Sequence, residues 1–191
     1  MGDAKLCVMY SRSSEPVKFE RDCDVVLVPS GEQVSMPAGS IGYITQSLGG
    51  SWTVFVEGNL MRIAGKDGDA IGKEPPTPID VPEGATVEDI EKLVWQQLRT
   101  CFDPEIPINV VELGLVYSAE LTALENNEYR ADVRMTLTAP GCGMGDILVD
   151  DVRSKLELIP TIREADVELV FDPPWNRNMM SDAAKLETGM F

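Results

Sequence analysis

The sequence contains no histidine among its 191 residues, and this absence excludes several kinds of site. Without an imidazole there is no Ser/His or Cys/His catalytic pair, no HExxH zinc site and no histidine general base. Long apolar runs are also missing, since none approaches the roughly 20 residues that a bilayer span requires. The amino-terminal sequence lacks the uninterrupted apolar core of a secretory signal. We therefore expect a cytoplasmic protein without a membrane segment.

Basic residues are scarce. The chain has 16 Lys and Arg against 32 Asp and Glu, a formal net charge of -16. Such a balance argues against nucleic acid or an anionic membrane as the main partner, and it favours cations or proteins with basic faces. The hydrophobic content of 43% is nevertheless high enough for a packed globular protein.

The four cysteines, Cys7, Cys23, Cys101 and Cys142, form no C-x-x-C pair. Wide spacing of this kind predicts reduced thiols in a reducing compartment and not a disulfide framework.

A proline-rich stretch divides the chain. Four prolines fall between Gly72 and Gly84, which indicates an extended linker. We predict an N-terminal arm over residues 1–19, a small β-rich domain over 20–72, a linker over 73–84 and an α/β domain over 85–191. The acidity belongs to the last part: residues 1–72 hold 9 acids and 6 bases, net -3, while residues 73–191 hold 23 and 10, net -13.

Short β-rich runs such as "VVLVP" and "SWTVFVEG" alternate with glycine and proline turns in the first domain, a pattern typical of small barrels and sandwiches. Gly49 and Gly50 predict a hairpin turn with positive φ.

The second domain has a clear element order. Thr86 to Asp89 resembles a capping box, and the apolar residues that follow predict a helical face with Cys101 as a core residue. Alternating runs over residues 115–121 and 129–137 predict a hairpin. A second helix is predicted next, with one apolar face formed by Leu148, Val152 and Leu156. A third strand follows, in which the apolar residues alternate: Ala165, Val167, Leu169 and Phe171. The predicted fold is α+β: a small all-β N-terminal domain, then a compact α-β-β-α-β domain with helices packed on one sheet.

Cys142 lies on a Gly-Cys-Gly turn between the second strand and the second helix of this domain. Unpaired N–H groups and the dipole at a helix N-terminus stabilise a thiolate, although the nearby acids Asp146, Asp150 and Asp151 oppose that effect. The residues alone leave two hypotheses open, a functional thiol and a structural turn cysteine.

Three stretches carry a family resemblance: "DPEIPINVVELGLVY" (103–117), "MTLTAPGCGMGDILVDDV" (135–152) and "VELVFDPPWNRNMMSDAAKLETGMF" (167–191). They closely resemble the SufT family, whose domain is similar to that of PaaD and of the eukaryotic cytosolic iron–sulfur targeting factor. Residues 28–72 also resemble the amino-terminal extension of longer SufT proteins.

The resemblance implies an accessory role in iron–sulfur cluster assembly or transfer to apo-proteins, and no enzymatic turnover. It implies as partners the Suf scaffold and carrier proteins and apo iron–sulfur enzymes. The motif cysteine carries over to Cys142 as functional thiol or transient cluster ligand. The supporting motif residues that carry over are Asp103, Pro104, Glu105, Thr138, Pro140, Gly141, Gly143 and Trp175.

A single thiolate supplies one ligand, whereas a stably held cluster usually needs four. We therefore expect no stably bound cofactor, and either a transient iron–sulfur cluster or a thiol at a protein interface. A homodimer could pool two Cys142 thiolates. Asp103 and Glu105 could sit beside Cys142 as hard oxygen ligands or as partner-binding charges; alternatively they are solvated carboxylates of a helix-terminating turn.

The C-terminal motif is open to two interpretations. Trp175 either anchors a partner or closes the core, and the Met179–Met180 pair is expected to pack more than to bind metal. Two alternative functions also stay open: a scaffold without an active thiol, and a thiol-dependent enzyme.

Overall fold

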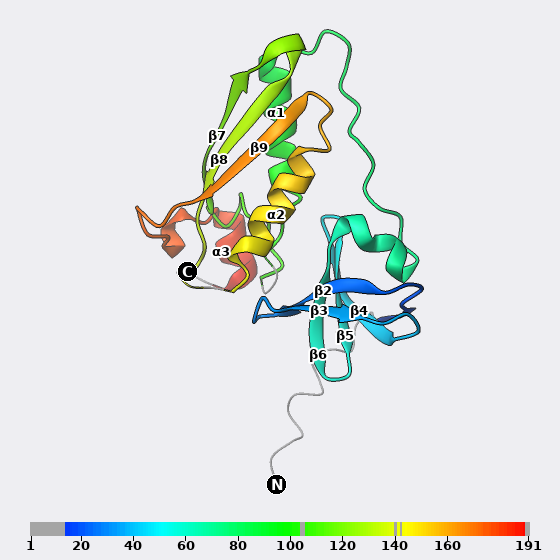
Figure 1. The fold of residues 1–191 in the computed structure, drawn as a ribbon. Coiled ribbons are helices and arrows are strands. Elements are labelled where there is room, and N and C mark those ends of the chain that lie inside the picture. The colour runs from blue at the N-terminus through cyan, green and yellow to red at the C-terminus, as the bar shows by residue number, and fades with distance from the viewer. Residues whose placement is uncertain (1–13, 104–105, 140, 142, 190–191) are drawn as a thin grey trace. The chain divides into compact units, whose positions relative to one another are not determined.

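The computed structural model describes residues 14–103, 106–139, 141 and 143–189, which form two compact units that divide between Pro76 and Thr77 (Figure 1). Both units contain helical and extended segments, so the predicted mixed α+β class is confirmed. Among the described residues, no helix is long and apolar enough to cross a membrane.

The first unit is one antiparallel sheet of six strands in the spatial order β1-β4-β5-β6-β2-β3. The strands are β1 (Glu15–Lys18), β2 (Cys23–Val28), β3 (Gln33–Met36), β4 (Ile41–Leu48), β5 (Ser51–Val56) and β6 (Asn59–Ile63). A 3-10 helix over Gly65–Ile71 follows the last strand.

Alternation of side chains fixes which face of this sheet holds the core. In β5, Val54 and Val56 are buried on the inner face while Phe55 lies on the outer one, as the period of two requires. Gly49 and Gly50 have φ of 59° and 76°, which confirms the predicted hairpin turn between β4 and β5.

The predicted N-terminal arm over residues 1–19 is wrong at its carboxyl end. β1 pairs with β4 from Glu15 to Lys18, and Phe19 is fully buried in the core of the first unit. The sequence did not predict this strand, because it has only four residues, carries two charges and contains Pro16. The first unit therefore begins before residue 20.

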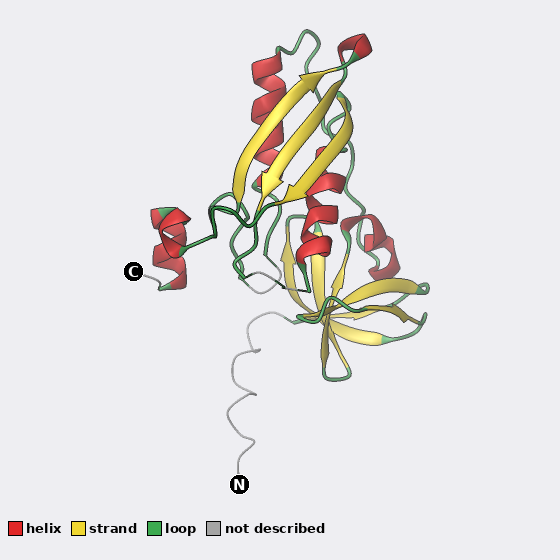
Figure 2. Ribbon diagram, turned by 60° about the vertical axis from the view of Figure 1, so that its left-hand side comes forward, coloured by secondary structure: helices red, strands yellow, loops and turns green. Residues whose placement is uncertain are grey.

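The second unit contains α1 (Val87–Leu98), β7 (Val116–Ala123), β8 (Tyr129–Met135), α2 (Gly145–Leu156), β9 (Ile162–Leu169) and α3 (Asp182–Thr188). Its sheet has the order β7-β8-β9, with β7 antiparallel and β9 parallel to β8 (Figure 2). Helices α1 and α2 contact each other, and they pack against β7 and β9 respectively.

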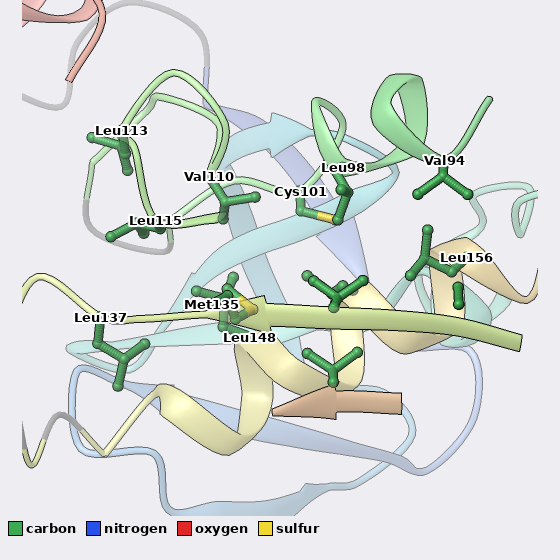
Figure 3. Close-up of a cluster of buried hydrophobic side chains, with 14 of the residues drawn as sticks. Val94, Leu98, Cys101, Val110, Leu113, Leu115, Met135, Leu137, Leu148 and Leu156 are labelled. Carbon is green, nitrogen blue, oxygen red and sulfur yellow. The ribbon is translucent and has the colours of Figure 1, made fainter. Parts of the chain in front are cut away.

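The core of the second unit lies between these two helices and the sheet (Figure 3). The predicted stripe of Leu148, Val152 and Leu156 is buried, and Cys101 is a fully buried core residue as expected. The prediction for Phe171 is wrong: this residue lies beyond β9 and is 46% exposed. Since β8 ends at Met135, no strand continues alongside Phe171 to pair with it.

The start of α1 generates a prediction about acid stability. Thr86 and Asp89 form the expected capping box, and the hydrogen bonds from Thr86 and then from Lys92 lower the pKa of Asp89 to about 2. A carboxylate with a depressed folded-state pKa stabilises the fold above its unfolded pKa, and that contribution disappears as the pH falls towards 2.

We expect Asp89→Asn to lower the urea midpoint at pH 5 to 7 and to approach the wild type between pH 4 and 2. Urea unfolding followed by circular dichroism measures this. Glu91→Gln, which removes an exposed acid from the same helix, is the matched control. A difference between Asp89→Asn and the wild type that stays constant down to pH 2 would contradict the proposed linkage.

Candidate functional site

Three chain segments meet at one end of the second unit's sheet. Register pairs Met135, the last residue of β8, with Val116 at the start of β7 and with Leu169 at the end of β9. The segment before β7, the segment after β8 and the segment after β9 therefore share this end, which we call the loop end. Its described residues are 101–103, 106–115, 136–139, 141, 143–144 and 170–180, and they belong to all three family motifs.

Backbone hydrogen bonds tie two of these segments together. The amide of Val110 donates to Cys101 O at 2.9 Å, and Leu115 donates to Val110 O at 2.9 Å. Thr136 in turn donates to Leu115 O at 2.8 Å. This series, which we call the backbone relay, connects the end of α1 to the end of β8. Figure 3 shows Cys101 and Val110 near Met135.

Asp103 begins a tight turn in the first segment. Its Oδ1 accepts a hydrogen bond from the amide of Ile106 at 2.9 Å, and its own amide donates to Ile108 O at 3.2 Å. The carboxylate thus stabilises the turn backbone. Pro104 and Glu105 lie outside the described residues.

The second segment leads into α2. Thr138 is half-buried, whereas Gly141 and Gly143 are exposed. Gly141 has φ of 80°, in the region that favours glycine. No side chain of the described residues caps the N-terminus of α2, which begins at Gly145. Pro140 and Cys142 lie outside the described residues, so the placement of the predicted thiol stays untested.

The third segment is a C-terminal arm, residues 173–180, that is bound to the loop before β7. The Tyr117 hydroxyl donates to Pro173 O at 2.6 Å, and Trp175 Nε1 donates to Leu113 O at 2.8 Å. Trp175 is partly buried against the core of the second unit. This packing supports the core-closing interpretation of Trp175.

Gly114 is a structurally required glycine that the sequence did not indicate. It has φ of 70°, and a Cβ there would clash with the Met179 carbonyl oxygen and lie 2.6 Å from the carbonyl carbon. The arm can therefore approach the loop only because residue 114 has no side chain. The residues next to Gly114 in the sequence, Leu113 and Leu115, give no sign that Met179 packs against it.

A buried ion pair lies beside the backbone relay. Lys155 of α2 is 7% exposed, and its Nζ donates to Thr100 O at 2.6 Å and to Asp151 Oδ2 at 2.9 Å. It thus satisfies a carbonyl just past the end of α1 and ties the two helices together. Over the described ranges, no three Cys, Asp or Glu side chains gather closely enough to hold a metal ion.

Of the predicted site residues, the structure places five at the loop end: Asp103, Thr138, Gly141, Gly143 and Trp175. They belong to all three segments, and the backbone relay and the arm hold those segments together.

We predict that Gly114→Ala destabilises the second unit more than Gly141→Ala does. Both glycines have positive φ, so each substitution carries a backbone cost of about 1–2 kcal/mol. Only at residue 114 does the new methyl group also meet the arm, which adds roughly 1–3 kcal/mol of overpacking. Urea unfolding of the two variants compares them, and equal losses of stability would contradict the close approach of the arm.

Comparison with known proteins agrees with the motifs. A family model described as "Iron-sulfur cluster assembly protein" matches residues 91–169. A "Fe-S protein maturation auxiliary factor" from Porphyromonas gingivalis is 43% identical over 104 residues, covering 54% of this chain and 91% of that protein. The "Fe-S protein maturation auxiliary factor SufT" from Staphylococcus aureus is 42% identical over 88 residues, covering 46% of this chain and 96% of that one.

A solved structure of a domain of unknown function, DUF59, from Bacillus anthracis is 38% identical, covers 55% of this chain and 95% of that one, and has a TM-score of 0.47. The similarity of residues 28–72 to the extension of longer SufT proteins stays a prediction. The two auxiliary factors are 43% and 42% identical to this chain over 91% and 96% of their own lengths, and the family model matches within the second unit. The chain therefore belongs to the family of SufT-type iron–sulfur cluster assembly proteins.

Proposed function

We propose that this protein is an accessory factor in the assembly of iron–sulfur clusters or in their transfer to apo-proteins. The observation that carries the proposal is the meeting of the three family motifs at the loop end, in the unit that the family model matches. The relatives are named auxiliary factors of Fe–S protein maturation, which supports a helper role without catalytic turnover.

The chemistry centres on Cys142 as a transient ligand or a partner contact. A thiolate ahead of a helix N-terminus is stabilised by the free N–H groups of the first turn, and α2 begins three residues after Cys142. One cysteine supplies one of the four ligands that a cluster usually takes. The cluster is therefore cargo, and its other ligands come from a carrier, a client or a second copy of this chain.

In the acidic motif, Asp103 has a structural role. Asp103 already accepts a hydrogen bond from the Ile106 amide, which supports its role in shaping the turn. Glu105, two residues further along the chain, is our candidate for an oxygen ligand or a partner-binding charge.

The partners that fit are the Suf scaffold and carrier proteins and apo iron–sulfur enzymes, in the cytoplasm. The net charge of -13 from residue 73 onwards favours partners with basic faces and disfavours nucleic acid and anionic membranes.

A scaffold without an active thiol is the second candidate function. The loop end is stabilised by backbone hydrogen bonds and by the Trp175 contact, neither of which involves the Cys142 thiol. Such a surface could bind partners through shape and charge alone.

A complementation experiment separates the two functions. Cells that lack the protein are complemented with the wild type, Cys142→Ser or Cys7→Ser, and aconitase activity is measured per unit of aconitase protein. We expect the wild type and Cys7→Ser to restore activity, and Cys142→Ser to restore less than about a tenth of it, because a serine hydroxyl does not replace a thiolate ligand.

Equal accumulation of the three proteins is the control. If Cys142→Ser restores aconitase activity fully, the thiol is dispensable and the protein acts as a scaffold. If loss of the protein left iron–sulfur enzymes fully active under iron limitation and oxidative stress, the accessory function itself would be wrong.

A further inference from the structure

The two edges of the second unit's sheet, β7 and β9, differ in how they are protected (Figure 1). An edge strand presents unpaired N–H and C=O groups, and proteins block such edges with charges, proline, short strands or a covering element. β9 carries four charged residues among eight, and Arg153 Nε of α2 donates to Ala165 O at 3.3 Å. β7 carries a single charge among eight residues, Glu120, and contains no proline.

The edges of the first unit's sheet are protected as well. Its edge strands β1 and β3 have four residues each, and β1 contains Pro16. Among the strands of the described ranges, β7 is therefore the long edge with little protection. Its one irregularity, a bulge between Val116 and Ser118, lies next to the loop end and leaves the rest of the strand regular.

The ladder with β8 shows which backbone groups of β7 face the open edge. Tyr129 of β8 pairs with Ala123, but its amide donates to Thr161 O, on the β9 side. In such a non-hydrogen-bonded pair, the N–H and C=O of Ala123 point away from β8. Alternation gives the same direction to Leu121 and Ala119. Among the described residues, no hydrogen bond from outside the sheet reaches these three backbone positions.

We propose that β7 pairs antiparallel with β7 of a second copy of this chain, about a two-fold axis at Leu121. Leu121 then lies opposite Leu121 of the partner subunit, and Ala119 lies opposite Ala123 of the partner subunit. Each pair joins residues whose backbone groups point outward, so each pair exchanges two hydrogen bonds. The two three-stranded sheets become one continuous sheet.

The charge of Glu120 and the bulge select this register. An axis at Glu120 would place the two Glu120 carboxylates directly opposite each other, which destabilises a strand pair. An axis at Ala119 would bring the bulged start of β7 into the pairing, and an axis nearer the hairpin would shorten it. With the axis at Leu121, Glu120 lies opposite the uncharged Thr122 of the partner subunit. The edge is therefore complementary to itself in one register.

Antiparallel pairing sets the strength of the dimer and the positions of its two loop ends. One strand from each copy buries less than the roughly 800 Å² per partner of a stable interface, so the dimer is weak and depends on concentration. Val116, at the loop end, lies five residues from Leu121, or about 17 Å along the strand. The two loop ends therefore lie about 34 Å apart and cannot share one cluster. This self-association goes beyond the proposed function and does not depend on it.

Sedimentation equilibrium of the full chain, with a thiol reductant present, tests the self-association over about a hundredfold range of concentration. We expect the dimer fraction to rise with concentration. Hydrogen exchange followed by NMR locates the contact. The amides of Ala119, Leu121 and Ala123 should exchange at least about tenfold more slowly in the concentrated sample, because pairing gives them acceptors. The amide of Val167 in β9 should exchange at the same rate in both samples.

Two variants test the edge and its register. Thr122→Lys places a cation opposite Glu120 of the partner subunit and should lower the Kd of the dimer by about threefold or more. Glu164→Gln is the matched control, because it changes the net charge by the same amount on β9, and it should leave the Kd unchanged. Ala123→Pro removes an outward N–H without breaking a bond to β8, and it should raise the Kd at least about tenfold.

Three results would overturn the proposal. The first is a chain that stays monomeric at every concentration. The second is a dimer whose Kd does not respond to Thr122→Lys, since that dimer would use another surface; this variant decides alone if Ala123→Pro fails to fold. The third is slow exchange of the β7 amides at every concentration without a dimer, because another segment of the same chain would then cover the edge.

Discussion

The backbone relay is the constraint on which the loop end depends. Buried amide and carbonyl groups outside helices and strands must still find partners, because each unpaired one costs about 1–3 kcal/mol. Cys101, Val110, Leu115 and Thr136 satisfy this requirement with one another. The irregular segment between α1 and β7 is thereby held against the end of β8, which is where the second motif begins.

The C-terminal arm adds a layer to this arrangement. It is fixed by side-chain donors, Tyr117 and Trp175, that reach backbone carbonyls more than fifty residues away in the sequence. Gly114 allows the approach by having no side chain. A site built from three segments in this way brings together motifs that are far apart along the chain.

The two units differ in net charge. The second unit carries most of the negative charge, which acts over distances of about a Debye length and steers basic partners. The first unit carries less charge, with 9 acids and 6 bases over residues 1–72. Binding of a basic partner through the second unit is therefore expected to respond to ionic strength.

The sequence by itself determined the features that depend on neighbours along the chain. The capping box at Thr86, the buried stripe of α2 and the turn at Gly49–Gly50 follow from local hydrogen bonds, helical periodicity and backbone freedom, and each is present. Tertiary structure alone decided the features that need distant partners. β1 exists because β4 lies beside it, Phe171 is exposed because β8 has already ended, and Gly114 matters because Met179 packs on it. Periodicity and propensity describe one segment at a time, whereas these contacts depend on which segments the fold places together.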